Sequence, residues 1–113
     1  MNNTTSPRPD TDETIEAEIV RKGLTAPRIT PADLEVAIAS EAYYVFKGSQ
    51  LTVCCLTLRN GFTVTGESAC ASPENFNAEI GERVARENAK QKLWPLLGFQ
   101  LRSELHRAQL ELA

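Results

Sequence analysis

A pair of polar side chains interrupts the apolar side of the helix predicted over residues 73–94. These are Asn88, near the middle of the apolar arc, and Lys92, one turn further on. An amide offers a hydrogen-bond donor and an acceptor side by side, so Asn88 could recognise the edge of a bound ligand. Alternatively, Asn88 bonds to backbone where two elements cross, and Lys92 extends its amine to water.

Two aromatic residues lie on one edge of the same predicted helix, Phe76 and Trp94. An aromatic ring can serve as a stacking platform for a purine, and such stacking is worth roughly 1–3 kcal/mol per base in single-strand binders. Core packing is the ordinary alternative. We assign Trp94 to the core and keep both interpretations for Phe76.

Arginines form the third group of candidates. Arg59 lies beside a tight turn, next to Phe62, where it could contact a ligand or bend into solvent. Three more arginines could bind phosphate, because the planar guanidinium matches phosphate oxygens: Arg86, Arg102 and Arg107. They could equally be solvated charges paired with helix neighbours such as Glu82, Glu104 and Glu111.

No catalytic or metal-binding pattern accompanies these residues. His106 is the single histidine, and the three cysteines have neither metal-ligand spacing nor clustered histidines, so we expect reduced and mostly buried thiols. Local spacing suggests no nucleophile with a base and no carboxylate pair. We therefore expect a binding protein and not an enzyme, with no cofactor and no metal.

Length and composition indicate one small α+β domain. The chain has 113 residues, of which 42% are hydrophobic and 24% charged, which is typical of globular proteins. A net charge of −3 argues against binding to duplex nucleic acid. No apolar run is long enough to cross a membrane, and the first residues do not resemble a signal peptide, so we expect a cytosolic protein.

The chain divides into an N-terminal segment and one domain. We expect residues 1–25 to form a flexible tail or a short helix, and residues 26–113 to form a single α+β domain. Thr30 and Pro31 have the residue types of an N-cap and a first-turn proline, which predicts one short helix before the sheet. Two C-terminal helices should follow the sheet, from Pro73 to about Trp94 and from Leu96 to about Leu112.

Between these helices the pattern predicts a three-stranded antiparallel β-meander, with strands over 42–47, 51–59 and 62–70. Asn60-Gly61 is typical of a two-residue type I′ turn. This turn would place Arg59 opposite Phe62 and Thr57 opposite Val64. Across the other turn, Tyr44 would lie opposite Val53.

The predicted register assigns the two faces of the sheet. The expected core face carries Ala42, Tyr44, Phe46, Leu51, Val53, Cys55, Phe62, Val64 and Cys70. The opposite face, with Tyr43, Val45, Cys54, Leu56 and Leu58, is too apolar to face water alone, so we expect another subunit to cover it. A row of small residues, Gly81, Ala85 and Ala89, would let another backbone approach the long helix.

The segment LTLRNGFTVTGESACASPENFNAEIGERVARENAKQKLWPLLGFQL carries a specific resemblance. Its NGF hairpin, GESAC strand end, NF helix start and closing W-x-L-x-G-F-x-L pattern resemble a family of small tailed-phage proteins. This family includes the type-one Thoeris anti-defence protein. The resemblance covers roughly residues 45–105.

The resemblance implies a sponge, a protein that binds an immune signal without degrading it. The signals would be cyclic ADP-ribose isomers made by bacterial TIR-domain enzymes, and cyclic trinucleotides of CBASS systems. Binding would take place between subunits of a homo-oligomer, a dimer-based assembly that is commonly a hexamer, in the cytoplasm of the infected bacterial host. The alternative is a phage early protein that inhibits a host protein by direct contact.

Overall fold

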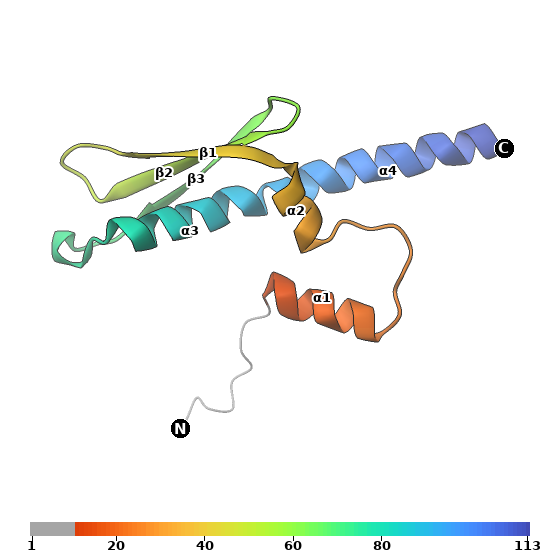
Figure 1. The fold of residues 1–113 in the computed structure, drawn as a ribbon, viewed down its shortest axis with the longest axis horizontal. Helices are drawn as coiled ribbons and strands as arrows, with labels where there is room; N and C mark the ends of the chain where they lie inside the picture. Colours follow the sequence, from red (N-terminus) through yellow and green to blue (C-terminus); the bar gives the residue numbers. More distant parts are fainter. Residues whose placement is uncertain (1–10) are drawn as a thin grey trace, which may run out of the picture.

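The computed structural model describes residues 11–113 (Figure 1). It contains helices α1 (Asp12–Arg21) and α2 (Pro31–Ala37), then strands β1 (Ile38–Val45), β2 (Leu51–Leu58) and β3 (Thr63–Ala69). A short 3-10 turn at Pro73–Asn75 precedes helices α3 (Ala78–Gln91) and α4 (Leu93–Leu112). The strands form one antiparallel sheet in the order β1-β2-β3. The predicted α+β meander with two C-terminal helices is therefore confirmed, and predictions for residues 1–10 lie outside the described residues.

Helices α1, α2 and α3 begin where a side chain accepts from a free backbone N–H group. The Thr30 hydroxyl accepts from the Asp33 backbone, and Pro31 occupies the first turn of α2, as predicted. By contrast, α3 begins later than expected, because Asn77 is its cap and accepts from the Ile80 N–H at 2.9 Å. The predicted start at Pro73 forms only the 3-10 turn.

The two C-terminal helices meet at Lys92 and not at Pro95. Lys92 ends α3 and caps α4, so the two form one bent helix. Pro95 lies in the first turn of α4, where its missing N–H has no helical acceptor and costs little. The expectation that Pro95 breaks the helix is therefore wrong by one turn.

Strand β1 also begins earlier than predicted, at Ile38 instead of Ala42. Ile38 pairs with Leu58, and the register shifts by one irregular step before Ser40. A β-branched residue suits this pleated position better than another helical turn. Beyond the irregular step, Tyr44 lies opposite Val53, as predicted.

The turn between β2 and β3 differs from the expected two-residue hairpin. Leu58 donates its N–H to Phe62 O at 2.8 Å, and Gly61 donates to Leu58 O at 2.9 Å. The loop therefore contains Arg59 as well as Asn60 and Gly61, and Gly61 adopts a φ of +91°. This is the three-residue loop in which a glycine closes the turn as a bulge. As a result Thr57 lies opposite Thr63, not Val64.

The core lies on the sheet face opposite to the one expected, because α3 packs on that face and the longer turn brings Val64 to it. The buried face carries Cys54, Leu56, Leu58 and Val64, which pack with Ala85 and Ala89 of α3. The face predicted to be the core is open along β1 and β2: Tyr44 is 61% and Phe46 47% exposed. Val64 is buried as predicted, because the longer turn moves it to the face that carries Leu56. Sequence reasoning therefore identified two distinct apolar faces but assigned the wrong face of β1 and β2 to the core.

Helix α3 packs very closely on β3. A Cβ added to Gly66 would lie 2.2 Å from the Ala89 backbone nitrogen and 2.4 Å from the Ala85 carbonyl oxygen. The small-residue row of α3 does allow another backbone to come close, as predicted. That backbone is β3 of the same chain.

The two outer helices contribute little to this core. Helix α4 extends beyond the end of the sheet (Figure 1), and Leu93 is its only buried residue. Helix α1 has no buried residue and is held by a two-hydrogen-bond ion pair between Arg28 and Glu16. None of the helices within residues 11–113 has the length and apolar character needed to span a membrane.

Candidate functional site

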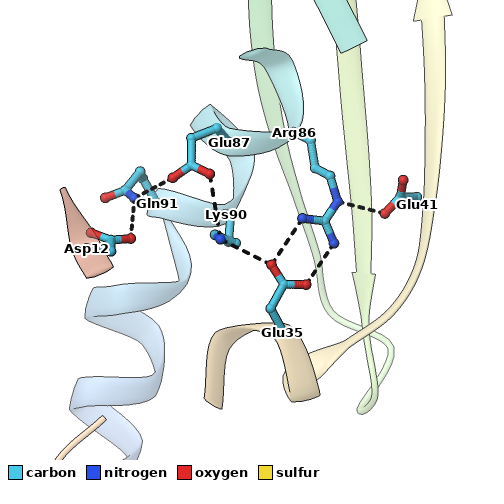
Figure 2. Close-up of polar contacts among 7 residues, drawn as sticks. All are labelled: Asp12, Glu35, Glu41, Arg86, Glu87, Lys90 and Gln91. Atoms are coloured by element: carbon cyan, nitrogen blue, oxygen red, sulfur yellow. Dashed lines mark hydrogen bonds and ion pairs between the residues drawn. The ribbon is translucent and has the colours of Figure 1, made fainter. Parts of the chain in front are cut away.

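An ion-pair cluster joins α3 to α2 and β1 (Figure 2). The Arg86 guanidinium donates to both carboxylate oxygens of Glu35, at 3.0 and 3.2 Å, and to Glu41 at 2.8 Å. Lys90 donates to Glu35 at 3.1 Å. Glu35 and Glu41 lie far from Arg86 in sequence, whereas the sequence suggested the helix neighbour Glu82 as its partner. Arg86 therefore links three elements in this structure.

The cluster shifts the ionisation of its members. Hydrogen bonds from Arg86, with Lys90 contributing, lower the pKa of Glu35 to about 2. The hydrogen bond from Arg86 also lowers the pKa of Glu41. Burial, and its hydrogen bond to Glu41, raise the pKa of Tyr43. These groups keep their charge states near neutral pH, which suits a structural cluster better than a proton-transfer site.

This cluster leads to a pH-dependent prediction. A carboxylate whose pKa is lowered on folding stabilises the protein above its ordinary pKa of 4.5, and that stability is lost as the pH falls towards 2. Because the Glu35 side chain is 48% exposed, solvent screening reduces the contribution to about 1 kcal/mol. Urea unfolding should show Glu35→Gln less stable than the parent at pH 7, with a gap that closes towards about pH 2.

The matched control is Glu18→Gln. Among the described residues Glu18 pairs only with Lys22, and both side chains are exposed on α1. Its replacement should leave the urea midpoint unchanged at every pH. A gap between Glu35→Gln and the parent that stays constant with pH would contradict the assignment.

A second group of candidates lies at the end of the sheet where β3 ends and α3 begins. Phe76 is 36% exposed and borders a hollow of about 80 Å³. The hollow is lined by Gln50, Ser68, Ala69, Cys70, Asn75, Phe76, Asn77, Ile80 and Gly81. Three amide side chains and one hydroxyl thus line the same hollow as a partly exposed aromatic ring. This combination can stack a flat ring and hydrogen-bond to its edge.

Asn88 lies on the same side of α3, two turns after Ile80. Its amide nitrogen donates to the Glu67 carbonyl oxygen at 2.8 Å, so the backbone contact considered from the sequence is present. The side chain is exposed, however, and its amide oxygen has no protein partner within residues 11–113. On the same side of α3, Ile80 is 52% exposed and Val84 is 43% exposed. This strip of α3 is uncovered in the single chain.

Arg59 lies at the opposite end of the sheet. Its backbone N–H donates to Ala37 O at 3.0 Å, and its side-chain Nε donates to Val36 O, so it caps the C-terminus of α2. Next to it are two hollows of about 390 and 170 Å³ that share four lining residues: Ala37, Arg59, Leu97 and Gln100. Local sequence spacing gave no signal for either hollow, because distant segments form their walls.

The remaining cationic candidates lie on the C-terminal helices. Lys92 is exposed at the bend between α3 and α4, and Arg102 and Arg107 are exposed on α4. Strand β3 runs the length of the sheet from the turn at Arg59 to the loop before Phe76. A single chain therefore does not bring Phe76 and Arg59 into one pocket.

The remaining side chains that could take part in chemistry do not lie together in one site. Cys54 is buried, and burial raises the pKa of its thiol, whereas Cys55 and Cys70 are free and partly exposed. Trp94 packs against the core, as assigned from the sequence. Within residues 11–113 no three His, Cys, Asp or Glu side chains are grouped to hold a metal ion.

Comparison with known proteins gives one match. Residues 29–105 match the sequence model of the family described as "Phage protein (N4 Gp49/phage Sf6 gene 66) family". This range includes the whole sheet, α2, α3 and most of α4. Neither the curated proteins nor the solved structures contain a significant match.

Proposed function

Because the chain belongs to the N4 Gp49/phage Sf6 gene 66 family of phage proteins, we propose that it is a phage anti-defence sponge. It would bind cyclic nucleotide immune signals in the cytoplasm of the infected host and hold them without degrading them. The ligands would be cyclic ADP-ribose isomers and, in addition, cyclic trinucleotides. This proposal combines the family membership with the resemblance of residues 45–105 to the small tailed-phage protein family that includes the type-one Thoeris anti-defence protein.

The observation that carries the proposal is the partly exposed Phe76 ring beside a hollow lined by three amide side chains and one hydroxyl. The ring can stack on an adenine base, and Asn75 or Asn77 can hydrogen-bond to the edge of that base. Further along α3, outside this hollow, Asn88 presents an amide oxygen without a protein partner in the described part of the chain to another part of the ligand. Binding of this kind needs no nucleophile.

A second subunit would complete the site. The hollow at Phe76 has a volume of about 80 Å³, whereas sites for small molecules usually enclose roughly 300–1,000 Å³. The exposed cations Lys92, Arg102 and Arg107 of a neighbouring copy could supply phosphate contacts. We therefore propose a homo-oligomer built from dimers, up to a hexamer, with ligand held between chains.

Titration calorimetry with cyclic ADP-ribose isomers and cyclic trinucleotides tests this proposal. Phe76→Ala should weaken binding by roughly 5- to 150-fold, which corresponds to the loss of about 1–3 kcal/mol of base stacking. Phe99→Ala is the matched control, because Phe99 is 75% exposed on α4 and lines none of the hollows described above. Equal affinities of the two variants, or no binding heat with any of these nucleotides, would contradict the proposal.

The exposed apolar residues of α4 favour a second candidate function. Leu110 and Leu112 are 61% and 89% exposed, and such a helix can dock into the groove of another protein. The protein would then inhibit a host protein by direct contact, without a small ligand. A single stoichiometric partner in host-lysate pull-downs, together with no nucleotide binding heat, would favour this alternative.

A further inference from the structure

Both ends of α1 are closed by contacts within residues 11–24. A capping box of two threonines satisfies the N-terminus. After the C-terminus, Gly23 adopts a φ of +69° and donates its N–H to Val20 O at 3.0 Å. The next residue, Leu24, donates its N–H to Ile19 O at 3.2 Å. These are the two hydrogen bonds of a Schellman motif, so the ends of α1 need no other part of the domain.

The side of α1 that turns toward the domain is largely acidic. The partly buried residues of the helix are Asp12, Glu16 and Ile19, and their spacing places them on one side of it. Ile15 and Val20 are 43% and 62% exposed, so much of the apolar surface of α1 points elsewhere. A helix is usually fixed to a domain by a packed apolar face. Packing therefore holds α1 only weakly.

Polar contacts hold α1 in place. The Glu16 carboxylate accepts from both terminal nitrogens of Arg28, at 2.5 and 2.7 Å. Asp12 accepts from the Gln91 amide at 2.9 Å, and the same amide donates to Glu87 (Figure 2). The Glu16 and Arg28 side chains are 26% and 28% exposed, so water and salt ions can reach and screen their charges. The docking of α1 therefore depends on electrostatic contacts that salt weakens.

We propose that α1 is a latch, a helix that docks and undocks reversibly while the rest of the domain stays folded. The ion pair of Glu16 with Arg28 is its main fastening. Residues 24–27 form its hinge, because they are exposed and belong to no helix or strand. The latch lies before residue 29, where the match to the phage family begins, and its action does not depend on nucleotide binding.

Undocking changes the hollow of about 390 Å³ that α2 and α4 border. Its lining includes two arginines and two acids, Arg28, Arg59, Asp33 and Glu104. While α1 is docked, Glu16 adds a third carboxylate beside them and occupies both terminal nitrogens of Arg28. Undocking withdraws this negative charge and leaves the Arg28 guanidinium free to turn. The latch therefore sets the charge and the hydrogen-bonding capacity beside this hollow.

Hydrogen–deuterium exchange of the full chain, resolved by segment with mass spectrometry, measures the opening directly. In the parent, the amides of α1 should exchange much faster than those of the buried strand β2. Glu16→Gln should speed the exchange of α1 by about 3-fold or more and leave β2 unchanged as an internal reference. Glu18→Gln is the matched control, because Glu18 pairs with Lys22 within the same segment and should not affect docking.

Salt provides a second readout, since raising the ionic strength from about 0.01 M to about 1 M shortens the Debye length from about 30 Å to about 3 Å. The exchange of α1 should speed up with salt in the parent and respond less in Glu16→Gln.

Three results would overturn the inference. Exchange of α1 no faster than that of β2 in the parent would show that α1 opens only when the whole domain unfolds. Equal exchange of α1 in Glu16→Gln and Glu18→Gln would show that the pair with Arg28 does not fasten the helix. Exchange of α1 that is independent of salt in the parent would show that its docking is not electrostatic.

Discussion

Gly66→Ala is expected to destabilise the protein by about 3 kcal/mol or more, which is a large part of the stability of a domain of this size. The added Cβ would meet the Ala89 nitrogen at 2.2 Å and the Ala85 carbonyl oxygen at 2.4 Å. Both are backbone atoms of α3, so no side chain can rotate away to relieve the overlap. The helix has to move off β3, and the core that it covers opens with it. Urea unfolding followed by circular dichroism measures the loss.

Gly98→Ala provides the matched control. Nothing lies within 4 Å of a Cβ at Gly98, which is inside α4 and has no special backbone conformation. Alanine should therefore stabilise the chain, by up to about 1 kcal/mol, through its helix propensity. If Gly66→Ala unfolds at the same urea concentration as the parent, the close packing of α3 on β3 is wrong.

Leu56→Ala and Leu51→Ala should have very different effects, although both residues are in β2. Leu56 is fully buried beneath α3, so its truncation should cost about 2–5 kcal/mol through lost burial and a cavity. Leu51 lies on the sheet face opposite α3 and is only partly buried. Its truncation should cost less than about 1 kcal/mol at protein concentrations low enough for the single chain to predominate.

The two leucine variants also distinguish the two possible assignments of the sheet faces. The face assignment expected from the sequence places Leu51 in the core and Leu56 outside it, which predicts the reverse order of stabilities. Thermal unfolding of both variants at low and high protein concentration decides between them. A larger loss for Leu51→Ala at low concentration would contradict the structure.

The order and type of the elements could be predicted from local signals. Cap residues such as Thr30, the β-rich segments and the helical periodicity all depend on near neighbours in sequence. The assignment of the sheet faces failed for a related reason. Asn60-Gly61 suits both a two-residue turn and a three-residue loop that ends in a glycine bulge, and the three-residue loop that forms shifts β3 by one position relative to β2. One residue of difference inverts every side chain relative to the partner strand.

The candidate site was less predictable, because its contacts join distant segments. Glu35 and Glu41 are 51 and 45 residues from Arg86, so local spacing suggested only helix neighbours as partners. Asn88 makes the backbone contact that the sequence analysis gave as its alternative, and its bond to Glu67 O crosses 21 residues. Phe76 and Arg59 lie beyond opposite ends of β3. A site that contains both residues would therefore have to form between two chains.

The sponge proposal is tested most directly by recovering the ligand after binding. The protein is saturated with a cyclic ADP-ribose isomer, freed of unbound ligand, and heated until it unfolds; the released compound is then identified by chromatography and mass spectrometry. We expect one chemically unchanged nucleotide per site, in an amount that matches the binding stoichiometry. The same experiment is repeated with a cyclic trinucleotide. An altered nucleotide would show turnover. If the protein retains neither kind of nucleotide, it is not a sponge for these signals.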